Sequence, residues 1–192
     1  DDYKISYENN VDAGTATMTI TGKGNYQGTF TKDYTIAPKN LAEPEVKIAP
    51  IDAQEYNGMA VTPAPSVSYE FGDGTYALSP VNDYTVAYAN NKGTGTATVT
   101  VTGTGNFTGS KTAEFRIGQL ITNETKFTIS CPALTDGTQY VYDGSAFEPE
   151  VTVTRIEGNK KLVKDSNYSV TYTDNIHAGT ATVSVEGLGG YV

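Results

Sequence analysis

The sequence predicts an all-β chain made of tandem β-sandwich repeats, with incomplete units at both ends. A threonine-rich segment occurs three times, and its marker glycines, Gly14, Gly95 and Gly179, are 81 and 84 residues apart. A period of this size indicates a repeat architecture. Each copy follows a Tyr-x-Val/Ile-x-Tyr run, whose alternation of apolar and polar residues is typical of a half-buried strand. Turn-forming Gly, Asn and Asp separate the runs, and no helical period is present.

Composition narrows the possible functions. Lys and Arg total 13 against 22 Asp and Glu, so the net charge is -9, which argues against a surface that follows nucleic-acid phosphates. The chain has no apolar run of the length that spans a membrane. Cys131 is the only cysteine, which excludes an internal disulfide. We expect the chain to be a segment of a longer repeat protein, with any signal peptide or anchor outside it.

Residues 1–38 are predicted to be the C-terminal half of a first repeat. Residues 3–7 and 15–21 alternate apolar and polar side chains and are predicted to form a hairpin, with threonine on the exposed face. Residues 29–36 supply a third strand, with Tyr34 pointing inward. A polar link with Pro38 then marks the first boundary, because proline cannot continue a central ladder.

The next two repeats are predicted to span residues 39–118 and 119–192. The first of them is complete, with about seven short strands and a tight hairpin at Gly72-Asp73-Gly74, a pattern that favours a β-sandwich. The second follows the same order and ends before the last strand of the unit. The length differences between the two fall in turn-like stretches, as expected for a fixed framework with variable loops.

Residue types that form active or binding sites in other proteins are predicted to have structural roles in this chain. The Gly-x-Gly turn at residues 22–28 is followed by a strand, so it lacks the helix N-terminus that a phosphate cradle needs. His177 is the only histidine and occupies a variable loop position, and Cys131 has no motif around it. The sequence therefore predicts no catalytic residue, no cofactor and no metal ligand. The acidic balance leaves open calcium bound between units.

Most of the 14 tyrosines recur at equivalent repeat positions that are expected to face the core. Tyr76 and Tyr140 do not recur and lie in loops that differ between copies. These loops, around Tyr76 and from Asp136 to Tyr140, are the candidate ligand contacts.

The repeat resembles a known family. Tyr56-Asn57-Gly58 with Pro63, the run at residues 83–91 and the run at residues 95–107 are similar to the MBG- and YDG-type Ig-like modules of large bacterial surface proteins and adhesins. The third copy departs from the pattern with Gly190 in place of the asparagine. The resemblance covers nearly the whole chain. It implies immunoglobulin-like sandwiches, an extracellular location at a bacterial surface, and a stalk or adhesive role.

The leading expectation is therefore a non-enzymatic spacer that holds a terminal functional domain away from a bacterial surface, with neighbouring repeats as its partners. The alternative is an adhesive module that recognises a host glycan or protein through the variable loops. The third hypothesis is an enzyme, for which the sequence offers few candidate catalytic residues. The incomplete end units are further expected to be able to pair between molecules, since exposed strand edges tend to do so.

Overall fold

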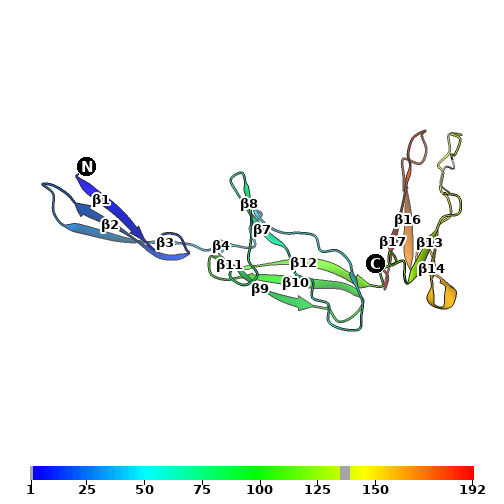
Figure 1. Cartoon of the computed structure of the whole chain (residues 1–192), viewed down its shortest axis with the longest axis horizontal. Helices are drawn as coiled ribbons and strands as arrows, with labels where there is room; N and C mark the ends of the chain where they lie inside the picture. Colours follow the sequence, from blue (N-terminus) through cyan, green and yellow to red (C-terminus); the bar gives the residue numbers. More distant parts are fainter. Residues whose placement is uncertain (1, 135–138) are drawn as a thin grey trace. The chain divides into compact units, whose positions relative to one another are not determined.

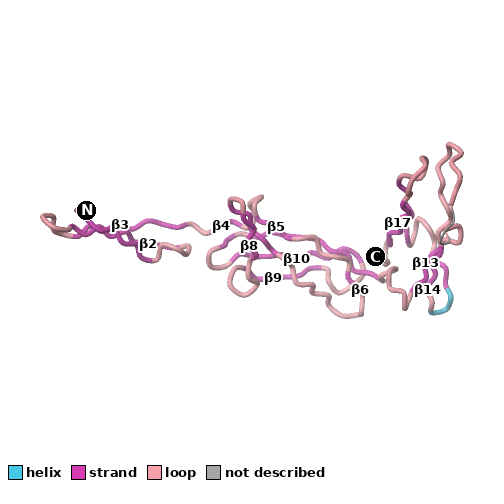
Figure 2. The backbone as a smooth tube through the Cα atoms, turned by 45° about the horizontal axis from the view of Figure 1, so that its top comes forward, coloured by secondary structure: helices cyan, strands magenta, loops and turns pink. Residues whose placement is uncertain are grey.

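The structure, a computed structural model, describes residues 2–134 and 139–192. It consists of strands joined by turns and loops (Figure 1), and the described residues include a single short 3-10 turn, Glu157–Asn159 (cyan in Figure 2). The prediction of an all-β chain is confirmed. No helix among the described residues is long and apolar enough to cross a membrane.

The chain forms two compact units, which are described separately. The first unit comprises Asp1–Pro50, Ala64–Tyr88 and Val99–Ala113, and the second comprises Ile51–Pro63, Ala89–Thr98 and Glu114–Val192.

The N-terminal strands of the first unit form one antiparallel sheet in the order β1-β2-β3, as the alternation predicted. These strands are β1 (Tyr3–Glu8), β2 (Gly14–Gly22) and β3 (Thr29–Ile36). Residues that pair across neighbouring strands lie on the same face of the sheet, so the register assigns each side chain to one of its two faces. One face carries the apolar residues together with Lys32, and the other carries threonine, Lys4, Ser6, Glu8 and Asp33.

The apolar face of this sheet is largely exposed. Tyr3 is 56% exposed and Tyr7 is 51% exposed, whereas Tyr84, which corresponds to Tyr3 in the second repeat, is 2% exposed. The sequence predicted that these recurring tyrosines face a core. They do lie on the apolar face, but no second layer of the described chain covers that face in the first repeat.

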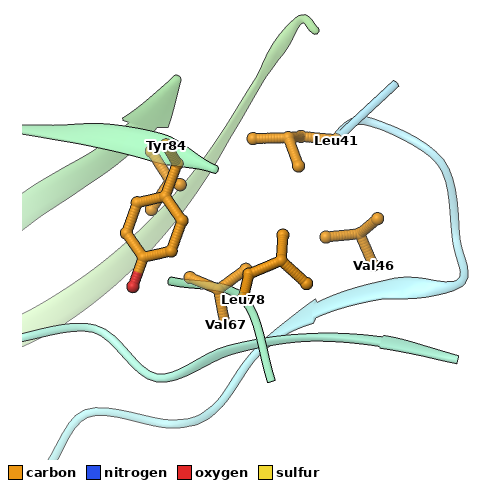
Figure 3. Packing of buried hydrophobic residues seen from close by; sticks show 6 residues of the cluster. Leu41, Val46, Val67, Leu78 and Tyr84 are labelled. Atoms are coloured by element: carbon orange, nitrogen blue, oxygen red, sulfur yellow. The ribbon is translucent and has the colours of Figure 1, made fainter. Parts of the chain in front are cut away.

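The core of the first unit forms where a second sheet is present. This sheet has the order β5-β7-β8, from β5 (Val46–Ile48), β7 (Val67–Phe71) and β8 (Gly74–Ala77). Glycines at both ends of the β7–β8 turn match the predicted hairpin. Figure 3 shows the side chains that converge toward the ring of Tyr84. With Val101, the cluster consists of Leu41, Val46, Val67, Leu78 and Tyr84.

A four-stranded sheet has the order β6-β12-β10-β9, and a two-stranded parallel pair joins β4 to β11. Their bounds are β4 (Lys39–Asn40), β6 (Gln54–Glu55), β9 (Tyr84–Ala89), β10 (Gly95–Gly103), β11 (Phe107–Thr108) and β12 (Ser110–Gly118). Ala97, Val99 and Val101 alternate with threonines along β10 and are fully buried. Their burial follows the period-2 pattern of the sequence.

The second unit has its own core between two small sheets. One sheet has the order β13-β14-β15 and the other pairs β16 with β17. The strands are β13 (Phe127–Ser130), β14 (Thr152–Arg155), β15 (Lys160–Lys161), β16 (Tyr168–Thr173) and β17 (Thr182–Gly187). The core cluster consists of Ile121, Phe127, Val153, Leu162 and Tyr168.

Equivalent sequence positions adopt the same unusual backbone conformation. Asn9, Asn90 and Asp174 all lie in the left-handed region, with φ of 52°, 56° and 55°. Asn and Asp tolerate this region because their short polar side chains bond locally, which explains the residue types at this hairpin position. The same backbone conformation thus occurs at all three of these positions.

Candidate functional site

Tyr76, a predicted contact residue, lies on β8 directly after the hairpin turn. Its backbone pairs with Tyr69 on β7, and its ring lies against Gly74, where an added Cβ would be 3.2 Å from ring atoms. The Tyr76 side chain is 57% exposed, and Phe71 on the same hairpin is 65% exposed. The hairpin thus presents two exposed aromatic rings, which suit contact with an apolar or sugar surface.

Tyr140, the second predicted contact residue, lies in the second unit. Its ring stacks on that of Phe147, with centroids 3.9 Å apart and planes inclined by 30°. Asp136, the third predicted residue, lies outside the described residues. Tyr76 and Tyr140 belong to different units, so each candidate surface is described by itself.

A hollow of about 630 Å³ opens beside the stacked pair in the second unit. Its lining includes the aromatic rings of Tyr142, Phe147 and Tyr172, together with Ala181 and Val183 from the β17 segment. Polar and apolar groups line the hollow in similar measure, so it offers a ligand both apolar contacts and hydrogen-bonding partners.

Tyr172 fixes one wall of the hollow. Its hydroxyl donates a hydrogen bond of 2.6 Å to the carbonyl oxygen of Pro149. Burial raises the pKa of Tyr172, and the neighbouring Cys131 and Glu148 raise it further. The phenol therefore stays protonated near neutral pH, where it serves as a hydrogen-bond donor.

His177 also lines the hollow, and its side chain is exposed. Cys131 is half-buried and forms no disulfide. Among residues 2–134 and 139–192, no group of three or more His, Cys, Asp or Glu side chains is placed to hold a metal ion. The shape of the hollow thus supports binding.

Asn106 forms a joint between repeats that the sequence did not predict. Its side-chain oxygen accepts a 2.6 Å hydrogen bond from the Ala13 amide, and its side-chain nitrogen donates to Asp12 at 2.8 Å. Its backbone oxygen accepts from the amide of Lys39, at 2.9 Å. One residue therefore holds both the hairpin loop of the first repeat and the link that leaves it. The repeated Gly-x-Gly-Asn motif is the available signal, but the motif by itself predicts only a turn.

Arg116 forms the corresponding joint in the second unit. Its guanidinium donates to the carbonyl oxygens of Gly187, at 3.0 Å, and Tyr191, at 2.9 Å, and lies 3.5 Å from the carboxylate of Glu186. A second ion pair, between Lys126 and Glu55, has a nitrogen–oxygen distance of 2.7 Å. Sequence comparison gave no signal for Arg116, because Thr35 occupies the equivalent position in the first repeat.

The two links themselves bond in the same way. Lys39 and Leu41 donate backbone hydrogen bonds to Asn106 and Thr108, at 2.9 and 2.8 Å. Gln119 and Ile121 donate to Gly190 and Val192, at 2.8 and 3.0 Å. Each link thus continues as the first bonded segment of the repeat that follows it.

Comparisons of the chain with models of protein families, with curated proteins and with solved structures found no match.

Proposed function

We propose that the chain is a non-enzymatic segment of tandem immunoglobulin-like repeats that serves as a spacer in an extracellular protein of a bacterial surface. In this role each repeat adds length, and each joint limits bending between one repeat and the next. The immunoglobulin-like class and the location rest on the resemblance of the repeat motif, and the spacer role also rests on the joints.

The observation that carries the proposal is the shared bonding of the two links. A flexible linker leaves its backbone solvated, whereas these links donate hydrogen bonds into the next repeat at matching positions. Side chains reinforce both joints, through Asn106 at the first and Arg116 at the second. Repetition of a bonded joint is what a spacer of defined length requires.

Small-angle scattering on tandem fusions of one, two and three copies of the chain tests this proposal. For a spacer, the maximum dimension grows in proportion to the number of copies. A dimension that grows only as the cube root of the mass, as in compact globules, would falsify the spacer role.

A joint variant sharpens the test. Asn106→Ala removes both side-chain hydrogen bonds of the first joint, so we expect it to broaden the distribution of interatomic distances in the fusion proteins. Asn25→Ala is the matched control, since Asn25 holds the equivalent position in the first repeat. If the two variants scatter identically, the Asn106 contacts do not stiffen the joint.

A second function, adhesive recognition of a host glycan or protein, is favoured by the exposed rings of Phe71 and Tyr76. The position of Tyr69 in this hairpin is occupied by Arg155 on β14 in the third repeat. The two positions correspond, since Tyr69 pairs with the first residue of β5 and Arg155 pairs with the first residue of β13. The aromatic hairpin is thus particular to one repeat, as expected of a binding feature rather than a framework feature.

Glycan and extracellular-matrix arrays probed with the chain distinguish the two functions. Binding that is lost in a Phe71→Ser, Tyr76→Ser double variant supports adhesion through the hairpin. Absence of binding across the arrays favours the spacer role alone.

A further inference from the structure

Asn57 is followed by Gly58, and this pair is the one Asn-Gly dipeptide of the sequence. It lies in the second unit, in the loop that follows β6. Asn57 and Gly58 are exposed, and the next side chain, Met59, is 67% exposed. Water therefore reaches both the side-chain amide of Asn57 and the backbone around it.

The loop holds the side chain of Asn57 against its own backbone. The Met59 amide donates a 2.9 Å hydrogen bond to Oδ1 of Asn57. A hydrogen bond from the amide two residues along the chain forms an Asx turn, in which the side chain imitates a backbone turn. The carbon that carries this oxygen, Cγ of Asn57, is therefore folded back toward the intervening amide nitrogen of Gly58.

The backbone nitrogen of Gly58 is accessible. Within residues 2–134 and 139–192 its N–H makes no hydrogen bond. Gly58 has a φ of 83°, a conformation that favours glycine, and a Cβ added there would meet nothing within 4 Å. Neither a hydrogen-bond partner nor a side chain of residue 58 thus shields this nitrogen from Cγ of Asn57.

The same turn activates the side-chain carbonyl of Asn57. If the Gly58 nitrogen attacks Cγ, negative charge develops on Oδ1. The Met59 N–H already donates to this oxygen, as the donors of an oxyanion hole do. Because nucleophile and carbonyl belong to one turn, the attack is intramolecular and much of its entropic cost has already been met.

The third repeat shows that a carboxylate fits this turn. Its equivalent residues are Asp143 and Gly144, and the Ser145 amide donates a 2.8 Å hydrogen bond to Oδ1 of Asp143. Gly144 has a φ of 85°, close to the value at Gly58. Replacement of the Asn57 amide by a carboxylate is therefore compatible with the same backbone conformation.

We propose that Asn57-Gly58 is a site of spontaneous deamidation, with water as the co-reactant. The Gly58 nitrogen gives up its proton and bonds to Cγ, and the Cγ–Nδ2 bond breaks and releases ammonia. Water then opens the cyclic imide. Cleavage between Cγ and the nitrogen leaves aspartate, and cleavage between the main-chain carbonyl carbon and the nitrogen leaves isoaspartate. No atom is oxidised or reduced, and the chain gains one negative charge near neutral pH.

The isoaspartate product changes the backbone at a place that is anchored on both sides. Its main chain passes through Cβ and Cγ and is therefore one atom longer. Before the site, Tyr56 donates a backbone hydrogen bond to Gly118 at 2.7 Å, and after it Val61 donates to Asn91 at 2.8 Å. We expect the longer backbone to loosen both anchors, so that the amides of Tyr56 and Val61 exchange faster in the isoaspartate form.

The first experiment follows the folded chain during incubation near neutral pH. Proteolytic fragments are analysed by mass spectrometry, and a methyltransferase specific for isoaspartyl residues labels that product. We expect conversion at Asn57 within about threefold of the rate in a free peptide of residues 52–62, because the turn keeps the nitrogen close to Cγ. The rate is expected to rise with pH, since the nucleophile is the deprotonated nitrogen. Asn57→Gln is the matched variant and is expected to stop conversion at this position, because its longer side chain must form a larger ring.

Asn123 is the internal control. It forms the same kind of turn, with its Oδ1 accepting a 3.1 Å hydrogen bond from the Thr125 amide, but Glu124 takes the place of glycine. The Glu124 side chain crowds the nitrogen, so we expect conversion at Asn123 to be at least about tenfold slower than at Asn57.

Three results would overturn the proposal. One is conversion of Asn57 in the folded chain that is more than about tenfold slower than in the peptide, because the turn would then protect the amide. Another is equal conversion of Asn57 and Asn123. The third is an equal gain of isoaspartate in the Asn57→Gln variant, which would place the reaction elsewhere in the chain.

Discussion

The hydroxyl of Tyr168 donates a 2.9 Å hydrogen bond to the carbonyl oxygen of Val151. The equivalent bond joins Tyr84 to Pro65 at 3.2 Å in the first unit. In both places the ring is buried in a core cluster, and the hydroxyl donates a hydrogen bond to a backbone carbonyl oxygen. At these two positions tyrosine therefore fills the core and also makes one hydrogen bond to the backbone.

Removal of this hydroxyl is expected to destabilise the second unit. Tyr168→Phe keeps the ring and leaves the Val151 carbonyl without its donor, which costs about 1 to 2 kcal/mol in the free energy of unfolding. Urea unfolding followed by circular dichroism measures the change. Tyr76→Phe is the control, because that hydroxyl is on an exposed side chain, and its unfolding midpoint is expected to match that of the parent chain.

Alkaline pH is expected to destabilise the first unit through Tyr84. Burial raises the pKa of Tyr84 above the ordinary value of 10.0, and the charge of Asp83 and the phenol of Tyr88 raise it further. Because the pKa of Tyr84 is higher in the folded chain than in the unfolded chain, Tyr84 contributes stability that is fully present below pH 10. This stability is lost as the pH rises through the pKa of the folded state. Unfolding curves between pH 8 and about pH 11.5 measure the slope, which Tyr84→Phe is expected to reduce. An unchanged slope would show that other groups control alkaline unfolding.

Gly103 is expected to resist substitution. A Cβ at this position would lie 2.7 Å from the Thr108 backbone nitrogen, closer than packed atoms approach. Gly103→Ala must shift the backbone where β10 turns toward β11, with an expected cost of about 1 to 3 kcal/mol. Gly93→Ala is the matched control, since a Cβ there meets nothing within 4 Å. Thermal unfolding that ranks the two variants equally would contradict this explanation.

Truncation of Leu41 tests whether the first link belongs to the core. Leu41 is 0% exposed and lies in the same cluster as Tyr84 (Figure 3). Leu41→Ala is therefore expected to cost about 2 to 5 kcal/mol, the range for a buried leucine. Val81→Ala, at a side chain that is 85% exposed, is the control and is expected to change stability by less than about 0.5 kcal/mol. A small effect at Leu41 would mean that the link is not anchored.

The sequence predicted the local structure well, because local structure depends on patterns of period two and on turn chemistry. The hairpin of β1 with β2, the third strand β3 and the turn at Gly72-Asp73-Gly74 all form where alternation and glycine indicated. The inward positions of β10 are likewise those of Ala97, Val99 and Val101.

The features that the sequence did not predict depend on which layers and neighbours are present. Tyr3 and Tyr84 have the same local pattern, yet one is exposed and the other is buried, because only the second has a sheet over it. The contacts of Arg116 join residues 71 and 75 positions apart, and the first repeat has Thr35 at the equivalent position. The contact function of Tyr76, Asp136 and Tyr140 stays a prediction, as do the repeat boundaries.

The parallel pairing of β4 with β11 has a mechanical consequence. When a chain is pulled from its two ends, two parallel strands loaded at opposite ends slide along each other, and their hydrogen bonds bear the load together. The bonds from Lys39 to Asn106 and from Leu41 to Thr108 are arranged in this way. Forced unfolding follows the unfolding rate, so such a shear clamp slows rupture under tension without requiring a large core. The resistance of this part of the chain to tension is therefore expected to depend on this short pair of strands.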